Sequence, residues 1–213
     1  MSKVILENYS KKINKKEVLK NINYTFDSGK IYGLFGRNGS GKTMLLRAIA
    51  GLIYPTSGVV KIDGKILHKD MSFPPKLGII IENTHLLPQY DSFTNLKILS
   101  KINNIATDDD IKQSIKQVGL DPDSRLKVKK FSLGMKQRLS IAQAIFEKPD
   151  LLLLDEPTNA IDEKGVEEIR TLLLNQKKLG ATIIIASHNK EDLSVLADIT
   201  LKMDEGKLFY EQA

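Results

Sequence analysis

The sequence predicts an α/β fold, in which a core with a parallel sheet carries an N-terminal antiparallel β subdomain and a helical subdomain insertion. Three observations support this. Strand-like segments and turns dominate the first third of the 213 residues, helical periodicity dominates the middle, and buried strands alternate with helices in the last third. We expect one domain, with the core and β subdomain over about residues 1–82 and 149–213, and the helical subdomain over about 83–148.

The first third is predicted to form mainly strands and turns. Segments with β-branched or alternating apolar residues are VILENY (4–9), VLKNINYTF (18–26), KIYGLFG (30–36) and GVVKIDGKIL (58–67). In the last of these, Asp63–Gly64 separates VVKI from KIL, and a type I′ turn needs the positive φ that such residues tolerate. We therefore expect a β-hairpin there, and a buried strand directly before the glycine-rich loop.

Two helices are predicted in the middle of the chain. TDDDIKQSIKQVG (107–119) has apolar residues at helical spacing, and Thr107 or Asp108 can cap its start. The second helix is expected over SLGMKQRLSIAQAIFEK (132–148), with Pro149 as its stop. We therefore expect the region from Asn83 to about Lys148 to be mostly helical.

Strands and helices alternate in the last third. Apolar strands are expected at LLLLDE (151–156) and ATIIIASH (181–188), helices over 163–180 and 189–198, and a closing hairpin over 199–210. Continuous apolar strands connected by helices imply a parallel sheet that is covered on both faces.

Composition excludes several kinds of chemistry. The chain has no cysteine, which rules out disulfides, thiolate catalysis and cysteine–zinc sites. The net charge is +6, but the lysines are spread along the chain, so we interpret them as solvated surface residues and expect no direct nucleic-acid binding. No apolar run approaches the roughly 18 residues that cross a bilayer. We expect a soluble, intracellular protein that can still dock on a membrane protein.

A glycine-rich loop carries the strongest functional signal. GRNGSGKT (36–43) fits G-x-x-x-x-G-K-[ST], follows a predicted strand and opens the helix TMLLRAIAGL, which is the context this motif requires. That context favours phosphate binding in a P-loop NTPase core over a purely structural turn. Glycines let backbone N–H groups converge on phosphate oxygens, and the helix N-terminus adds positive charge. The residues expected at the phosphates are Gly36, Asn38, Gly39, Ser40, Gly41, Lys42 and Thr43.

Two carboxylates end the strand LLLLDE. We expect Asp155 to bind Mg²⁺ together with Thr43, and Glu156, which points the other way, to polarise the attacking water. The alternative is that the pair only caps the next helix, and the phosphate loop disfavours it. His188 ends the next strand and is expected near the γ-phosphate, although an isolated histidine is usually a surface or capping residue.

Together these motifs resemble the ATP-binding cassette (ABC) family of transporter ATPases over essentially the whole chain. GRNGSGKT resembles the Walker A loop, LLLLDEP the Walker B strand, TNAID the D-loop that ends at Asp162, and FSLGMKQRL the signature motif, while His188 resembles the switch histidine. In this family two cassettes close head to tail around two ATP molecules. The resemblance implies that Ser132 and the backbone of Gly134 touch the γ-phosphate bound by the partner.

The sequence departs from the family pattern at three places. Leu133 and Met135 replace the usual glycine and glutamine of the signature, a variant that resembles exporters of the bacitracin and lantibiotic type. Glu82 falls where the family has the Q-loop glutamine, and a carboxylate there can still contact Mg²⁺. Ile13 falls where the family stacks an aromatic ring on adenine, so base selectivity is expected to be loose.

The resemblance implies an ATP-hydrolysing subunit that uses ATP and Mg²⁺, dimerises with itself or with another ABC ATPase subunit, and drives a separate transmembrane permease. Export is favoured, a peptide antibiotic or other amphipathic compound is a guess at the substrate, and the protein would be peripheral on the inner face of the cell membrane. A groove between the Glu82 region and the helical insertion would receive the permease. The alternatives are a soluble ABC-type ATPase acting on nucleic acid or ribosomes, and a regulatory cassette without turnover.

Overall fold

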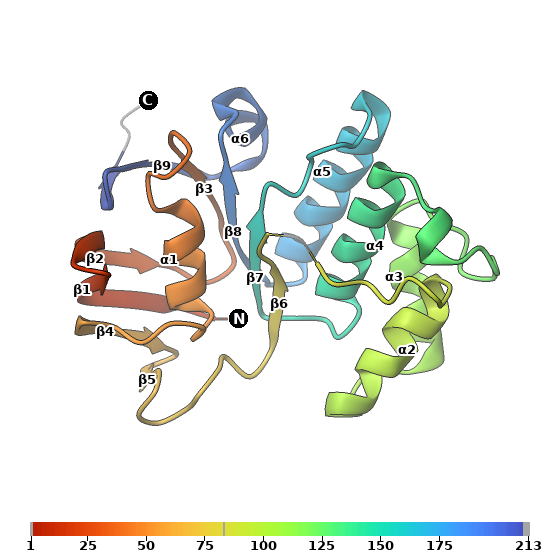
Figure 1. The fold of residues 1–213 in the computed structure, drawn as a ribbon, viewed down its shortest axis with the longest axis horizontal. Helices are drawn as coiled ribbons and strands as arrows, with labels where there is room; N and C mark the ends of the chain where they lie inside the picture. The colour runs from red at the N-terminus through yellow and green to blue at the C-terminus, as the bar shows by residue number, and fades with distance from the viewer. Residues whose placement is uncertain (1, 83, 211–213) are drawn as a thin grey trace.

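The computed structural model describes residues 2–82 and 84–210. The chain folds into two sheets and a group of helices (Figure 1). Asn83, where the helical insertion is expected to begin, lies outside the described residues. None of the described helices is long and apolar enough to cross a membrane.

The smaller sheet is antiparallel and has the strand order β2-β1-β4-β5. Its strands are β1 (Val4–Ile13), β2 (Lys16–Phe26), β4 (Ser57–Ile62) and β5 (Lys65–Ile66). Between β4 and β5, Asp63 has φ 51° and Gly64 has φ 81°. Two successive positive φ values are those of a type I′ turn, so the predicted hairpin at Asp63–Gly64 is confirmed.

The larger sheet has the strand order β10-β9-β3-β8-β7-β6. Its strands are β3 (Ile31–Phe35), β6 (Leu77–Ile80), β7 (Leu151–Asp155), β8 (Thr182–Ser187), β9 (Ile199–Asp204) and β10 (Lys207–Tyr210). All neighbours pair in parallel except β9 and β10, which form the predicted closing hairpin. The edge strand β6 is not among the strands predicted from the sequence.

The two central strands are buried on both faces. Alternate residues of β7 and β8 belong to two different hydrophobic clusters: Leu152 and Leu154 pack with the residues of α4 and α5, whereas Leu151 and Leu153 pack with α1 and the antiparallel sheet. Figure 1 shows the same layers, with α1 (Lys42–Ile49) on one side of the sheet and α5 (Glu163–Lys178) on the other. The parallel sheet therefore presents its carboxyl edge between two covered faces.

The chain between β6 and β7 is helical. It contains α2 (Ser92–Asn103), α3 (Asp108–Gln117), the 3₁₀ turn η1 (Val128–Lys130) and α4 (Leu133–Ile145). Thr107 caps α3 in a capping box with Asp110, so Thr107 rather than Asp108 is the N-cap. The helix predicted to extend to Lys148 ends at Ile145, because a residue before proline avoids the helical conformation, and Lys148 has φ 53°.

Candidate functional site

The glycine-rich loop connects β3 to α1 at the carboxyl edge of the parallel sheet. Gly39 and Gly41 have φ 78° and 113°, a region that side chains with a Cβ rarely adopt. A Cβ on Gly36 would lie 2.2 Å from the carbonyl oxygen of Met203, so only glycine fits there. The loop is thus shaped by its glycines so that the amides at the start of α1 face the same space as the end of β7.

Lys42 is held inside this loop. Its side chain is buried, and its Nζ donates to the carbonyl oxygens of Gly36 at 2.7 Å and Arg37 at 3.4 Å. The hydroxyl of Ser40 is also buried, and it has no hydrogen-bond partner among the residues that the structure describes. A buried ammonium and an orphaned hydroxyl in one loop fit an anion with several acceptor oxygens.

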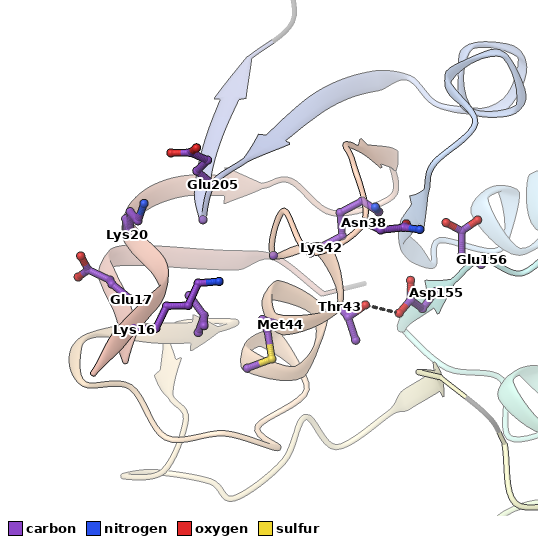
Figure 2. A pocket seen from close by; sticks show the side chains of 14 residues that line it. Lys16, Glu17, Lys20, Asn38, Lys42, Thr43, Met44, Asp155, Glu156 and Glu205 are labelled. Atoms are coloured by element: carbon purple, nitrogen blue, oxygen red, sulfur yellow. Dashed lines mark hydrogen bonds between the residues drawn. The ribbon is translucent and has the colours of Figure 1, made fainter. Parts of the chain in front are cut away.

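Thr43 and Asp155 come together across the sheet edge. The hydroxyl of Thr43 donates to Oδ2 of Asp155 over 2.6 Å (Figure 2). Burial raises the pKa of Asp155, while the Thr43 hydrogen bond lowers it and the nearby charges of Glu156 and Glu82 raise it further. A hydroxyl beside a partly buried carboxylate is an all-oxygen donor set, which suits a hard divalent cation. Such a cation would offset the free-energy cost of burying the negative charge of the carboxylate.

Glu156 is oriented by the end of β8. Its Oε1 accepts hydrogen bonds from the backbone N–H and from Nδ1 of His188, each at 2.8 Å, and its Oε2 accepts one from the Ser187 hydroxyl at 3.1 Å. The His188 ring nitrogen that faces the carboxylate carries the proton, because a carboxylate only accepts. The two residues predicted to be catalytic therefore form one pair.

A cavity of about 670 Å³ opens beside the loop. Asn38, Lys42, Thr43, Asp155 and Glu156 line it, and Figure 2 shows the two carboxylates at one end and a group of charged side chains at the other. That group consists of Lys16, Glu17, Lys20 and Glu205. The cavity thus joins the loop and both carboxylates to a distant charged rim.

Ile13 does not line this cavity. It is the last residue of β1 and is 40% exposed, while its strand partner Lys16 does line the cavity. Tyr9, the aromatic residue nearest in sequence, is buried and directs its hydroxyl to the Ile53 carbonyl at 3.4 Å. The role of Ile13 at a base therefore stays a prediction.

Glu82 follows β6, which lies beside β7, and so stands near the Asp155 edge. Its Oε1 accepts a hydrogen bond from Arg47 Nη2 at 2.7 Å. Its charge contributes to the raised pKa of Asp155, which places it within electrostatic reach of that carboxylate. The structure thus brings Glu82 to the predicted neighbourhood, with its carboxylate paired to α1.

The signature residues lie apart from this cavity. Ser132 is the N-cap of α4 and accepts from the Met135 N–H at 3.2 Å, and neither Ser132 nor Gly134 lines the cavity. Asp162 is the N-cap of α5 and lies 3.5 Å from Arg138 Nη2. Within one chain these predicted residues form a second, separate group.

Two contacts of the site are not among the predictions. Ser187 and Gln137 both hold the Glu156 region, Ser187 through its hydroxyl and Gln137 through its side-chain amide. A signal for Ser187 is present in the sequence, since a serine at the end of an apolar strand directly before a candidate catalytic histidine lies at the same sheet edge. Gln137 gives no comparable signal, because its partners are backbone carbonyls.

Comparison with known proteins gives one consistent picture. The family model described as ABC transporter matches residues 19–159. The ABC transporter ATP-binding protein YybJ of Bacillus subtilis is 67% identical over 94% of this chain and 92% of its own length. The bacitracin transport ATP-binding protein BcrA of Enterococcus faecalis is 38% identical over 96% of this chain and 67% of its length.

Two further matches agree with these. The lantibiotic transport ATP-binding protein SrtF of Streptococcus pyogenes is 36% identical and covers 97% of this chain and 89% of its own length. Among solved structures, the dimeric form of a bacterial ABC transporter cassette superposes with a TM-score of 0.86 at 25% identity, covering 98% of this chain and 97% of that one.

Proposed function

The chain belongs to the ABC transporter family as an ATP-hydrolysing, ATP-binding subunit, and from that premise we propose which residues bind ATP, which hydrolyse it and which partners complete the site. The observation that carries the proposal is the junction of three elements at one sheet edge. The glycine-rich loop, the Thr43–Asp155 pair and the Glu156–His188 pair meet there. Thr43, Asp155 and Glu156 line the cavity of about 670 Å³, while His188 lines a neighbouring one together with Gly36 and Arg37.

We propose that ATP lies in this cavity with its phosphates on the loop of residues 36–43. The amides at the N-terminus of α1 would donate to phosphate oxygens. Lys42 would exchange its bonds to the Gly36 and Arg37 carbonyls for stronger bonds to the β- and γ-phosphates, because charge-assisted bonds exceed those to neutral acceptors. The hydroxyl of Ser40 would gain the partner that it lacks among the described residues.

Mg²⁺ fits beside Thr43 and Asp155. Their oxygens would form the donor set, and Glu82, which is paired with Arg47 near the same edge, would offer a further carboxylate. When bound, Mg²⁺ would neutralise charge on the phosphate oxygens and so favour transfer of the γ-phosphoryl group to water, with ADP as the leaving group. Asp155 would then be ionised, since the cation offsets the effect of burial on its pKa.

We assign the activation of water to Glu156. Its carboxylate is held at the end of β8 by Ser187 and His188, and a water on its free acceptor positions would donate a proton toward it. His188, bonded to the same oxygen through Nδ1, would hold the carboxylate in a fixed orientation toward the γ-phosphate.

We propose that two cassettes complete each other's sites. Leu133 is 70% exposed at the start of α4, next to Ser132 and Gly134, and none of these three residues lines the cavity beside the phosphate loop. A head-to-tail dimer would bury Leu133 and bring the amides of α4 to the phosphate held by the partner. That a structurally similar cassette is dimeric supports pairing of two cassettes. Asp162, at the end of the TNAID segment, would lie at the same interface.

A separate membrane-spanning subunit is the second proposed partner. A groove of about 580 Å³ lies between the segment before β6 and the helical region, which we propose to act as a subdomain over about 83–148. Glu82 does not line this groove, so it is not the groove expected beside Glu82. Its exposed apolar residues include Leu52, Phe73, Ile102 and Ile105. A permease segment docked there would hold the chain at the inner face of the cell membrane. The names of BcrA and SrtF, which are bacitracin and lantibiotic transport ATP-binding proteins, support a peptide antibiotic or a similar amphipathic compound as the substrate, and we propose export as the direction.

Co-purification tests the transporter assignment. Tagged chain would be isolated from detergent-solubilised native membranes, and the recovered proteins identified by mass spectrometry. A stoichiometric multi-span membrane protein, lost when Ile102→Glu and Ile105→Glu place charges in the groove, is the expected result. Recovery of only soluble or ribonucleoprotein partners would overturn the assignment.

A further inference from the structure

The first two turns of α4 contact the chain's own hydrolytic segment. Gly134, Gln137 and Arg138 lie on one face of the helix, because residues three and four positions apart are neighbours on a helix surface. That face is directed at residues 156–162, which begin with Glu156 and end with Asp162. We refer to Gly134, Gln137 and Arg138 as the α4 clamp.

Gln137 holds the backbone around the carboxylate. Its Nε2 donates to the Pro157 carbonyl at 3.0 Å and to the Glu156 carbonyl at 3.3 Å. An amide NH₂ has two hydrogens, so one side chain can serve both carbonyls, and only the nitrogen end can face them. Gln137 is partly buried, so bulk water competes less for these bonds than it would at an exposed position.

The backbone that Gln137 holds is an unusual one. Glu156 has φ 49°, a left-handed conformation that is uncommon for non-glycine residues and costs free energy. The N–H of Glu156 donates to the Ala186 carbonyl in β8 at 2.8 Å, while its C=O accepts from Gln137. Two different elements thus hold the two sides of this residue, and together they set the direction of its side chain.

Arg138 holds the other end of the segment. Its Nη2 lies 3.5 Å from Asp162, and its Nη1 donates to the Val118 carbonyl at 2.7 Å and to Glu168 at 2.8 Å. Glycines make the room for it: a Cβ on Gly165 would lie 2.2 Å from Nη2, and one on Gly119 would lie 2.5 Å from Nη1. The glycine inside α5 therefore has a specific packing reason.

Gly134 contacts the middle of the segment from Glu156 to Asp162. A Cβ at this position would lie 2.8 Å from the Ala160 carbonyl oxygen, so the absence of a side chain lets the segment approach the helix. The segment between Glu156 and Asp162 is consequently fixed to α4 at its start, at its middle and at its end.

We propose that Gln137 is a positioning residue for hydrolysis, which acts through the α4 clamp on Glu156 of its own chain, while the N-terminus of the same helix serves the ATP of the partner. This rests on the function proposed above. One rigid helix would then connect the two sites of a dimer: a change at the α4 N-terminus on one site would reach Glu156 of the other.

Substitution of Gln137 tests the role. Gln137→Met keeps the length of the side chain but removes both donors, so we expect kcat to fall roughly ten- to a hundredfold as Glu156 loses its alignment, with KM for ATP unchanged. Gln137→Lys, which retains donors for both carbonyls, should recover most of the rate. Gln113→Met, at an exposed position of α3, is the matched control and should behave as wild type. A fall in KM and kcat together, or a failure of lysine to rescue, would point to a structural role.

Mixed dimers with two affinity tags separate the two chains. In the first dimer, one chain carries Gln137→Met and the other carries Glu156→Gln. Only the site with the Glu156 of the Gln137→Met chain can hydrolyse ATP, and its rate should fall because Gln137 no longer holds that Glu156. In the second dimer, one chain carries both substitutions and its partner is wild type. The working site then uses the wild-type Glu156 with its own intact clamp, so the rate should equal that of a reference dimer of one wild-type chain and one Glu156→Gln chain. Equal loss in both arrangements would overturn the proposal. If that reference dimer neither forms with ATP nor turns over, the proposed function fails instead.

Discussion

The phosphate-loop edge and the α4 N-terminus differ in how far one chain satisfies them. At the loop edge, Thr43 is bonded to Asp155, and Glu156 is bonded to Ser187 and His188. At the α4 N-terminus, Ser132 only caps its own helix, and Leu133 is exposed beside it. The fold of one chain is enough to assemble the phosphate-loop edge. The α4 N-terminus is an exposed surface, which we propose to be covered by a second cassette.

The helix α4 can therefore contribute to two sites. Its N-terminus faces outward, while Gln137 and Arg138 on its next turn face the chain's own carboxylate segment. Substitutions in the first region should therefore damage the chain that carries them, and substitutions in the second should damage the partner.

The largest effect is expected from Glu156→Gln. The amide cannot take a proton from water, so turnover should fall by on the order of 10²–10⁴ while ATP still binds. Size-exclusion chromatography with light scattering should show an ATP-trapped dimer. Near-normal turnover would remove Glu156 from its assigned role.

Lys42→Ala tests whether the glycine-rich loop binds phosphate. It removes a charge-assisted donor to phosphate, which is worth about 1.5–3 kcal/mol, so the Kd for ATP should rise roughly ten- to a hundredfold. Titration calorimetry measures this directly. Unchanged ATP affinity would contradict phosphate binding by this loop.

Ile13→Tyr examines the far end of the cavity. An aromatic ring offers a stacking face that isoleucine lacks, worth about 0.5–1.5 kcal/mol, so preference for ATP over GTP should change by a few-fold. Competition binding with both nucleotides is the measurement. No change in preference would mean that the base lies elsewhere.

Asp155→Asn separates stability from activity. Burial raises the pKa of Asp155, so the folded state binds this proton more tightly than the unfolded state, and the associated stability is lost as pH rises. Without Mg²⁺, the variant should melt at a higher temperature than wild type near neutral pH, and the difference should shrink as pH falls toward about 4. Thermal unfolding across pH, with and without Mg²⁺, checks this, because only wild type should gain from the cation.

The smallest effect on turnover is expected from Thr107→Ala. Loss of the capping box at α3 should reduce the free energy of unfolding by about 1 kcal/mol, yet α3 contributes no side chain to the cavity. Denaturant unfolding should show the loss while kcat stays near wild type. A large loss of turnover would mean that α3 supports the site more directly than the structure indicates.

The sequence predicts the loop edge well because its motifs are local. Gly36 to Thr43 and Leu151 to Glu156 are short segments, and a parallel sheet brings the ends of their strands together. The edge strand β6 is missed because Leu77–Ile80 is short and only half-buried, so its pattern is weak. The α4 clamp is missed because Gln137 recognises carbonyl groups, which every residue carries.

The composite site is tested most directly by mixing two inactive chains. Lys42→Ala disables the phosphate loop, and Ser132→Asp keeps the helix cap but sets a negative charge against the partner's phosphate. A mixed dimer of the two retains one intact loop facing one intact α4 N-terminus. With ATP held between the wild-type Kd and the raised Kd of the Lys42→Ala loop, each variant alone should be nearly inactive. An equimolar mixture should then recover about a quarter of the wild-type rate, since half of the dimers are mixed and each has one working site. No recovery in a mixture that forms dimers would contradict a site composed of two chains.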